Sequence, residues 1–377
     1  MQRSKLKIVM IILALLIFGI LFYDNFRDGP KENAEIKAKV LKVDNSEVIR
    51  SGITGVGYQS LVVRIVEGKH KGKRFKAINQ LTGKAEIDNF LKKGDKILVA
   101  IKEKEGQIIA VKVIDLYRQG WQLVLFGIFI LLLIIYARAV GVMALFSFVA
   151  SLYVIWKFLI PGLLAGYNPL LLASLTIIVL TAIIIFSIAG LTKKGLAAFI
   201  GTVSGLIATI GITVFFGNKL ALRGMTAPFS QVLLFSGHMD LNMKHIFYAS
   251  IVIGASGAAM DIAMDVAASV AEIKDKSPDI EMKELIQSGF NVGRAVIGTM
   301  TTTLLLAYSG GYLTLLMLFS TRSTSLDRMI NFKMVTAEVL RTLAGSIGLV
   351  LVAPLTAILA GWIYSVDLKE LVELRKD

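Results

Sequence analysis

The chain of 377 residues is too apolar for an ordinary water-soluble domain, with 55% hydrophobic residues, 18% charged residues and a mean hydropathy of +0.70. Its formal net charge of +14 would suit nucleic acid, but Lys and Arg lie mainly near the ends of apolar stretches and in residues 26–118. Membrane topology and anionic headgroups account for such charges. The absence of cysteine excludes disulfides, thiolate metal sites and cysteine nucleophiles. We therefore expect an integral membrane protein whose partner is the lipid bilayer, with no nucleic-acid partner.

Eight segments are apolar over the length of about 20 residues that a helix needs to cross about 30 Å of hydrocarbon. They lie at about 6–23, 120–137, 141–160, 169–190, 196–217, 246–270, 296–319 and 342–364. The first follows Arg3, Lys5 and Lys7 and has no small-residue cleavage site after it, so we interpret it as an uncleaved anchor. Gly201 and Gly205 in the fifth segment form a small-xxx-small packing surface.

The basic residues of the short loops predict that both termini are cytoplasmic and that the protein lies in the cell membrane. This orientation puts the following residues inside: Arg138, Lys193, Lys194, Lys274, Lys276, Lys283, Lys369, Arg375 and Lys376. The loop 320–336 does not fit this orientation, because its basic residues Arg322, Arg328 and Lys333 then lie outside the cell.

Residues 26–118 form the only extended polar stretch, and they alternate between apolar and polar side chains as short strands do. Strands are expected at Glu35 to Val43, Gln59 to Val66, Arg74 to Asn79, Lys96 to Ile101 and Ile108 to Val113, with a short helix at Lys84 to Leu91. This pattern predicts a small external barrel of OB type. The basic run from Lys69 to Arg74 is better interpreted as a solvated hairpin turn than as a phosphate site, because no aromatic ladder accompanies it.

The predicted fold class is an all-α polytopic membrane protein of about eight transmembrane helices with this OB-like β-rich domain outside the membrane. The expected domains are an anchor (1–25), the external domain (26–118), spans two to four (119–192), a helical core of spans five to eight (193–366) and a cytoplasmic tail (367–377).

Asp261 and Asp265 are the candidate ion-relay residues of the sixth segment. Their spacing of four places both on one face of a helix otherwise rich in small residues. An ionised carboxylate at membrane depth costs several kcal/mol unless it is paired, solvated or protonated. The pair is therefore suited to load and release a proton or to bind a cation. The alternative is structural, with both carboxylates capping a helix or bridging to Arg294 or Arg341.

The seventh segment adds further polar residues to this candidate site. Arg294 stands at the predicted mouth of the span, and Thr299, Thr301 and Thr302 with Thr303 follow within it, where their hydroxyls line a polar path or simply bond to their own helix. Gly310 and Gly311 permit a break or close packing. The supporting polar residues are Glu272, Asn291, Glu338 and Arg341, of which the last two are expected to pair because they are three residues apart.

The sequence gives little support for enzymatic chemistry. Gly254 to Gly257 matches the G-x-S-G string of rhomboid proteases, but His70, His238 and His245 all lie outside the predicted spans, so an intramembrane base is lacking. His238 and His245 with Asp240 are better explained by a polar loop than by a metal site. We expect no enzyme, no catalytic residue, no cofactor and no metal.

Three stretches resemble the YibE/F family of bacterial membrane proteins: GASGAAMDIAMDVAASVAEI, NVGRAVIGTMTTTLLLAYSGG and RTLAGSIGLVLVAPLTAILAG. From Lys193 onward the chain is also distantly similar to the SecD/SecF branch of the RND superfamily. In SecD-like chains an Asp precedes a Glu by seven positions, as Asp265 precedes Glu272 here. In SecF-like chains an Arg is followed at seven and eight positions by Thr, as Arg294 is here. SecD/SecF halves have six spans, so 120–160 would be an added hairpin, and their usual cytoplasmic Arg is replaced here by Ile273 and Lys274.

The resemblance to SecD/SecF implies an ion-coupled transporter or export-assisting factor, in which proton or sodium passage at Asp265 and Asp261 drives the external segment. It also implies a homo-oligomer or a paired membrane subunit. The alternative is a membrane scaffold or sensor that transports nothing and in which the Asp residues are structural.

Overall fold

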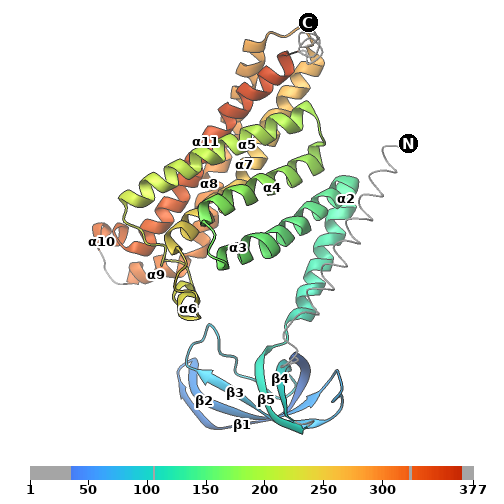
Figure 1. Ribbon diagram of the computed structural model, residues 1–377, viewed down its shortest axis with the longest axis vertical. Helices are drawn as coiled ribbons and strands as arrows, with labels where there is room; N and C mark the ends of the chain where they lie inside the picture. Colours follow the sequence, from blue (N-terminus) through green and yellow to red (C-terminus); the bar gives the residue numbers. More distant parts are fainter. Residues whose placement is uncertain (1–34, 105–106, 322–324, 367–377) are drawn as a thin grey trace. The chain divides into compact units, whose positions relative to one another are not determined.

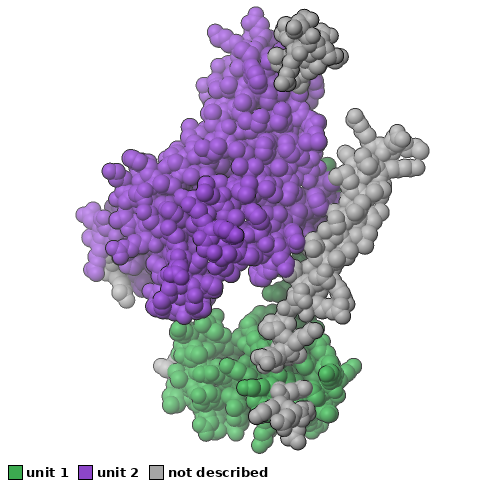
Figure 2. Space-filling view, viewed as in Figure 1, with its two compact units in different colours: residues 1–141 green, residues 142–377 purple. Residues whose placement is uncertain are grey.

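The computed structural model describes residues 35–104, 107–321 and 325–366, and the chain divides into two compact units, residues 1–141 and 142–377 (Figure 2). The predicted anchor span 6–23 and the predicted tail 367–377 lie outside the described residues.

The first unit contains a closed five-stranded barrel, which confirms the predicted β-rich domain (Figure 1). Its strands are β1 (Glu35–Ser51), β2 (Thr54–Ile65), β3 (Arg74–Thr82), β4 (Lys96–Lys104) and β5 (Gln107–Leu116), in the order β1-β2-β3-β5-β4. Neighbouring strands are antiparallel except β3 and β5, which run parallel and meet at the single pair Ile78 and Lys112. Alternate residues such as Val63 and Val99 fill the interior, because strand side chains alternate between two faces.

The predicted short helix at 84–91 is wrong, since this segment is a turn followed by irregular chain. Asp88 accepts hydrogen bonds from the backbone N–H groups of Thr82 (2.8 Å) and Lys84 (3.1 Å) and from the Thr82 hydroxyl (3.0 Å). A side chain that bonds to nearby backbone in this way stabilises a turn at the expense of a helix.

Helices make up the rest of the chain. They are α2 (Gln119–Val154), continued by a π-helical turn (Ile155–Leu159) and α3 (Ile160–Leu164), then α4 (Pro169–Ala189), α5 (Lys193–Lys219), α6 (Ser230–Phe235), α7 (Met243–Lys276), α8 (Met282–Gly311), α9 (Leu313–Thr321), α10 (Leu326–Ile330) and α11 (Lys333–Ser365). Polar caps fix several starts: the Asn168 side chain accepts from the Leu170 N–H, Thr192 from Gly195 and Asn242 from His245.

Within the described residues, five helices are long and apolar enough to cross a membrane, or six if α8 and α9, bent by 68°, count as one span. The 46-residue stretch Gln119–Leu164 contains both predicted spans 120–137 and 141–160, and its helix breaks at Arg138, whose φ is 48°. Gly310 and Gly311 immediately precede the bend between α8 and α9. A Cβ on either glycine would meet nothing within 4 Å, so the two residues permit the break in the helix and do not serve close packing. The helices indicate a multi-pass membrane protein, and the count of about eight remains a prediction.

The second unit is built around α7 and α11. In the most apolar stretch of each helix, 61% of the residues are buried in α7 and 56% in α11. The buried share is 33% in both α4 and α5. Both α5 and α8 contact α7 and α11, and α4 contacts α5 and α7 (Figure 1). The core consists largely of small and β-branched residues such as Ala263, Val266 and Val352, which let helix backbones approach closely.

A regular exchange of small and larger residues joins α5 to α11. A Cβ on Gly201 would collide with Thr356, one on Gly205 with Val352, and one on Gly348 with Thr209. The contacts recur every four residues in opposite chain directions, so the two helices are antiparallel and in a fixed register. Thr209 and Thr356 donate their buried hydroxyls to carbonyls four residues earlier, at 2.9 and 2.8 Å, so neither hydroxyl is left unpaired in the contact.

Replacement of Gly201 by alanine should lower the melting temperature in detergent, because the new methyl group must displace Thr356 and overpacking of this kind costs about 1–3 kcal/mol. Gly211→Ala is the matched control on the same helix, where a Cβ meets nothing within 4 Å. Equal melting temperatures for the two variants would contradict the close α5–α11 contact.

Candidate functional site

Asp261 and Asp265 lie on the exposed face of α7, together with Gly254 and Gly257. The opposite face of the same helix is fully buried, for example at Ile262 and Val266. The shared face predicted from their spacing is therefore present, and it points away from the core of the second unit.

The register of α7 against α8 brings Arg294 to the depth of Asp265. A Cβ on Gly293 would lie 3.7 Å from Val266, and one on Gly289 would lie 3.0 Å from Val270, so the two helices run antiparallel with these pairs opposite each other. In antiparallel helices the residue after Gly293 lies level with the residue before Val266, so Arg294 lies level with Asp265. In the structure Arg294 lies within α8, twelve residues after the helix begins at Met282, and its predicted place at the mouth of a span stays a prediction.

Neither Asp bridges to the arginines that the structural alternative names. Among the described residues, Asp261 and Asp265 have no ion-pair partner within 4.0 Å. Arg294 is exposed and donates to the Asn291 side chain at 3.3 Å. The arrangement thus leaves both carboxylates available to a proton, a cation, water or another protein surface.

The threonine hydroxyls of α8 are bonded to their own helix. Thr299, Thr301 and Thr302 donate to the carbonyls of Val296, Ile297 and Thr299 at 3.0, 2.8 and 2.9 Å. All three side chains are exposed. Each hydroxyl oxygen can still accept a hydrogen bond, so these residues can face water without leaving a donor unpaired.

Glu272 makes an exposed ion pair with Lys276, one turn further along α7, with 2.8 Å between carboxylate and ammonium. It lies eleven residues beyond Asp261 on a solvated turn, and surface pairs of this kind contribute little stability. Nothing in this contact joins Glu272 to the Asp pair.

Glu338 and Arg341 pair with each other on α11, as their spacing predicted, with Arg341 Nε 3.3 Å from Glu338 Oε1. The side chains are only 14% and 18% exposed. The Arg341 guanidinium also lies over the rings of Phe247 and Tyr308, at 5.5 and 5.8 Å from their centroids. These aromatic partners were missed from the sequence, because α7, α8 and α11 converge here from distant parts of the chain.

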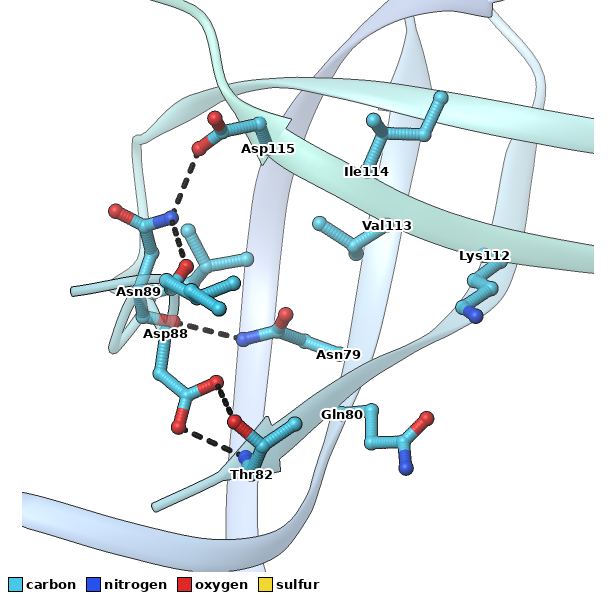
Figure 3. Close-up of a pocket in the computed structure, with 11 residues that line it drawn as sticks. Asn79, Gln80, Thr82, Asp88, Asn89, Lys112, Val113, Ile114 and Asp115 are labelled. Carbon is cyan, nitrogen blue, oxygen red and sulfur yellow. Dashed lines mark hydrogen bonds between the residues drawn. The ribbon is translucent and has the colours of Figure 1, made fainter. Parts of the chain in front are cut away.

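The barrel has a polar network of its own, also missed from the sequence. The buried Gln59 side chain accepts from the Leu91 N–H (2.9 Å) and from Asn79 Nδ2 (2.9 Å), and Asn79 donates in turn to the Asn89 carbonyl (2.8 Å). Asn89 donates to Asp115 at 2.8 Å, as Figure 3 shows. The network ties the segment 83–95 to β2, β3 and β5.

A pocket of about 190 Å³ lies beside this network, where β3 and β5 diverge (Figure 3). Lys112 and Gln80 line it with Asp88, Asp115 and Asn89. Burial opposes ionisation of Asp115, but hydrogen bonds from Arg118, the Leu116 N–H and Asn89 outweigh it and lower its pKa. Because Asp88 and Asp115 are already bonded within the barrel, the pocket organises the loop and shows no built ligand site. In the described part of the chain no group of three or more His, Cys, Asp or Glu side chains could hold a metal.

The apolar helices and the barrel indicate a polytopic helical membrane protein with a small β-barrel domain. Residues 125–366 match the family described as YibE/F-like protein, and residues 33–116 match the YibE/F family N-terminal domain. The chain therefore belongs to the YibE/F family.

Searches of curated proteins and of solved structures gave no match. Neither family match concerns SecD or SecF, so that resemblance stays a prediction.

The barrel expressed as residues 33–118 should fold alone and show a β-type circular dichroism spectrum, because it encloses its own core.

Burial opposes ionisation of Asp88, but hydrogen bonds from Thr82, Gly83 and Lys84 lower its pKa. Because the pKa of Asp88 is lower in the folded state, its ionised form stabilises the domain at pH values above the unfolded pKa of about 3.9. This stabilisation is lost as the pH falls through the folded-state pKa. Asp88→Asn should therefore reduce the urea midpoint at pH 7, with a smaller difference at pH 3.

Glu86→Gln, which removes a carboxylate from the same exposed loop, is the control. A random-coil spectrum for the wild-type domain would contradict independent folding. A difference between Asp88→Asn and wild type that is equal at both pH values would contradict the ionic origin of the effect.

Proposed function

We propose that this protein is a proton- or sodium-coupled transporter, or an export-assisting factor, of the cell membrane, with Asp265 and Asp261 as its ion relay. The observation that supports it is the acidic face of α7, where neither carboxylate has an ion-pair partner within 4.0 Å among the described residues. A charged Asp at the centre of a membrane helix costs about 2.5–3.5 kcal/mol on insertion scales. Two such residues on one stripe are hard to explain by folding alone.

The parts assigned to the residues follow from their positions. Asp265 loads and releases the ion, because it lies at the depth of Arg294, a positive charge that can exchange with the loaded ion. Asp261, one turn away, disfavours the state in which both carboxylates are bare, since like charges repel. Thr299, Thr301 and Thr302 offer hydroxyl oxygens on the neighbouring helix, and Asn291 holds the Arg294 guanidinium.

The proposal includes the predicted topology. Eight spans, the anchor 6–23 included, put both termini in the cytoplasm and the barrel outside, where ion passage through the RND-like core 193–366 would move it. The solute or polymer that is moved carries no signature in the sequence.

A second copy of the chain is proposed as the partner that covers the acidic face. Lipid is a poor neighbour for Asp261, Asp265 and Arg294 together. A two-fold axis along the membrane normal keeps equal residues at equal depth, so Arg294 of one copy meets Asp265 of the other at the same level. The exposed acidic and basic residues are thus complementary across such an axis.

Asp265→Asn should abolish ion flux in liposomes while leaving expression and melting temperature close to wild type, because the amide keeps the shape but does not titrate. Asp261→Asn should reduce flux less, and Arg294→Gln should impair it. Asp275→Asn is the control, since Asp275 is exposed near the end of the same helix.

A scaffold or sensor with structural Asp residues gives another pattern, in which Asp265→Asn lowers the melting temperature and activity falls only in proportion. An Asp265→Asn protein as stable and as active as wild type would end the ion-relay proposal.

The interface can be tested in this cysteine-free chain by co-expressing Asp265→Cys copies with differently tagged Arg294→Cys copies. Mild oxidation should join the two tags in one cross-linked species. Copies carrying Gly211→Cys, on an exposed position of α5, should not cross-link to either. Absence of the mixed species, with monomers alone on native gels, would contradict the dimer.

A further inference from the structure

The proposed relay does not use the partly buried Glu338–Arg341 pair, although this is the most enclosed ion pair among the described residues. We propose that Glu338 and Tyr308 form a second proton-transfer site, which connects Asp261 and Asp265 to the end of the bundle where α11 begins. This inference rests on the proposed function and deepens it, because it also names the coupling ion as the proton.

Three polar atoms at this site have no hydrogen-bond partner among the described residues, and one of them, Arg341 Nε, is held only by its ion pair with Glu338 Oε1 at 3.3 Å. The Tyr308 hydroxyl and Glu338 Oε2 are both shielded from solvent and have no hydrogen-bond partner among the described residues. A buried polar group left unsatisfied costs about 1–3 kcal/mol, so such atoms usually hold a bound water. The two oxygen atoms, contributed by α8 and α11 around one guanidinium, mark a small hydrated site inside an otherwise apolar bundle.

The surroundings of Glu338 set its chemistry. From its own helix it faces Arg341, and from the α8 side it faces the Tyr312 hydroxyl and Tyr308. The α7 residue at the Arg341 guanidinium is Phe247, which does not titrate. Glu338 is therefore the acidic group of this cluster, and Arg341 returns it to the carboxylate form after each transfer.

A path leads from Tyr308 to the acidic face of α7. A Cβ on Gly254 would lie 2.7 Å from the Tyr308 hydroxyl oxygen, so this hydroxyl lies against the α7 backbone. Gly254 and Gly257 are exposed and carry no side chain that would fill the space toward Asp261. At 1.5 Å per residue, Gly254 is about 10 Å from Asp261 along the helix, a gap of about three hydrogen-bonded waters.

The transfer is balanced without any further reactant. Glu338 Oε2 takes a proton from a hydronium ion, which leaves as water, and then gives the proton to the water held at the Tyr308 hydroxyl. The carboxylate is regenerated, and the proton moves on through the Gly254–Gly257 stretch to Asp261. The proton forms a covalent bond with the Glu338 carboxylate and passes beside Arg341 as part of a neutral acid, whereas a sodium ion keeps its full charge there and is repelled by the guanidinium.

The test measures ion flux into liposomes containing the full chain under a proton gradient and, separately, a sodium gradient. Tyr308→Phe should reduce proton flux at least tenfold and shift its pH profile, with the melting temperature unchanged. Tyr248→Phe is the matched control, because it also removes a tyrosine hydroxyl, here one on a fully buried ring that donates to the Asn218 side chain at 3.3 Å. Sodium alone should drive no flux.

Glu338→Gln leaves Arg341 without its counter-charge and can fail to fold, so the double variant Glu338→Gln, Arg341→Gln is measured beside it. A proton-transfer role predicts that the neutral pair folds but carries at least tenfold less flux. A structural role predicts that the neutral pair regains wild-type flux, which would overturn the inference.

The outcomes separate this inference from the proposed function. Wild-type flux and an unshifted pH profile in Tyr308→Phe, with Asp265→Asn inactive, would overturn the second site alone. Flux driven by sodium and not by protons would overturn the choice of ion. A wild-type protein without flux, or an active Asp265→Asn protein, would overturn the proposed function and this inference with it.

Discussion

The close antiparallel contact of α5 with α11 is the constraint on which the helical unit depends. Gly201 faces Thr356, Gly205 faces Val352 and Gly348 faces Thr209, so a small residue on one helix always meets a larger one on the other. Helices in lipid gain little from burying apolar surface, and close packing of this kind is what holds them together. Because the contact fixes the register of α11, it also fixes α8, whose Gly289 and Gly293 lie against Ala357 and Ala353 of the same helix.

The same register decides what the polar residues can do. With Gly293 opposite Val266, Arg294 lies at the depth of Asp265, and with Gly254 against Tyr308 the other end of α8 approaches the Arg341 cluster. Packing of small residues thus places one group of ionisable side chains on α7 and α8, and it brings the second group, on α11, beside Phe247 and Tyr308 of the same two helices. The acidic group faces outward and the Glu338–Arg341 pair lies inside, so the two differ in their access to water.

The barrel solves a different packing problem. Its interior is apolar and continuous, but β3 and β5 are joined by a single residue pair, Ile78 and Lys112. The buried amides of Gln59 and Asn79 stabilise this weak edge by hydrogen-bonding the segment 83–95, which closes the barrel beside them. Polar groups inside an apolar core are tolerated here because the hydrogen-bonding network satisfies them.

Periodicity and composition were enough to predict the membrane class, the β-rich domain, the shared face of Asp261 and Asp265 and the Glu338–Arg341 pair, because all of these depend on residues close together in the sequence. For Gly310 and Gly311 the sequence left a break and close packing open, and the structure shows the break. The helix expected at 84–91 failed because Asp88 bonds to the backbone of a turn, a local competition that spacing does not show. Only the tertiary structure decided the depth of Arg294, the aromatic partners of Arg341 and the Gln59–Asn79 network. Each of these depends on which helix or strand lies beside another, and that is set by the packing of residues far apart in the chain.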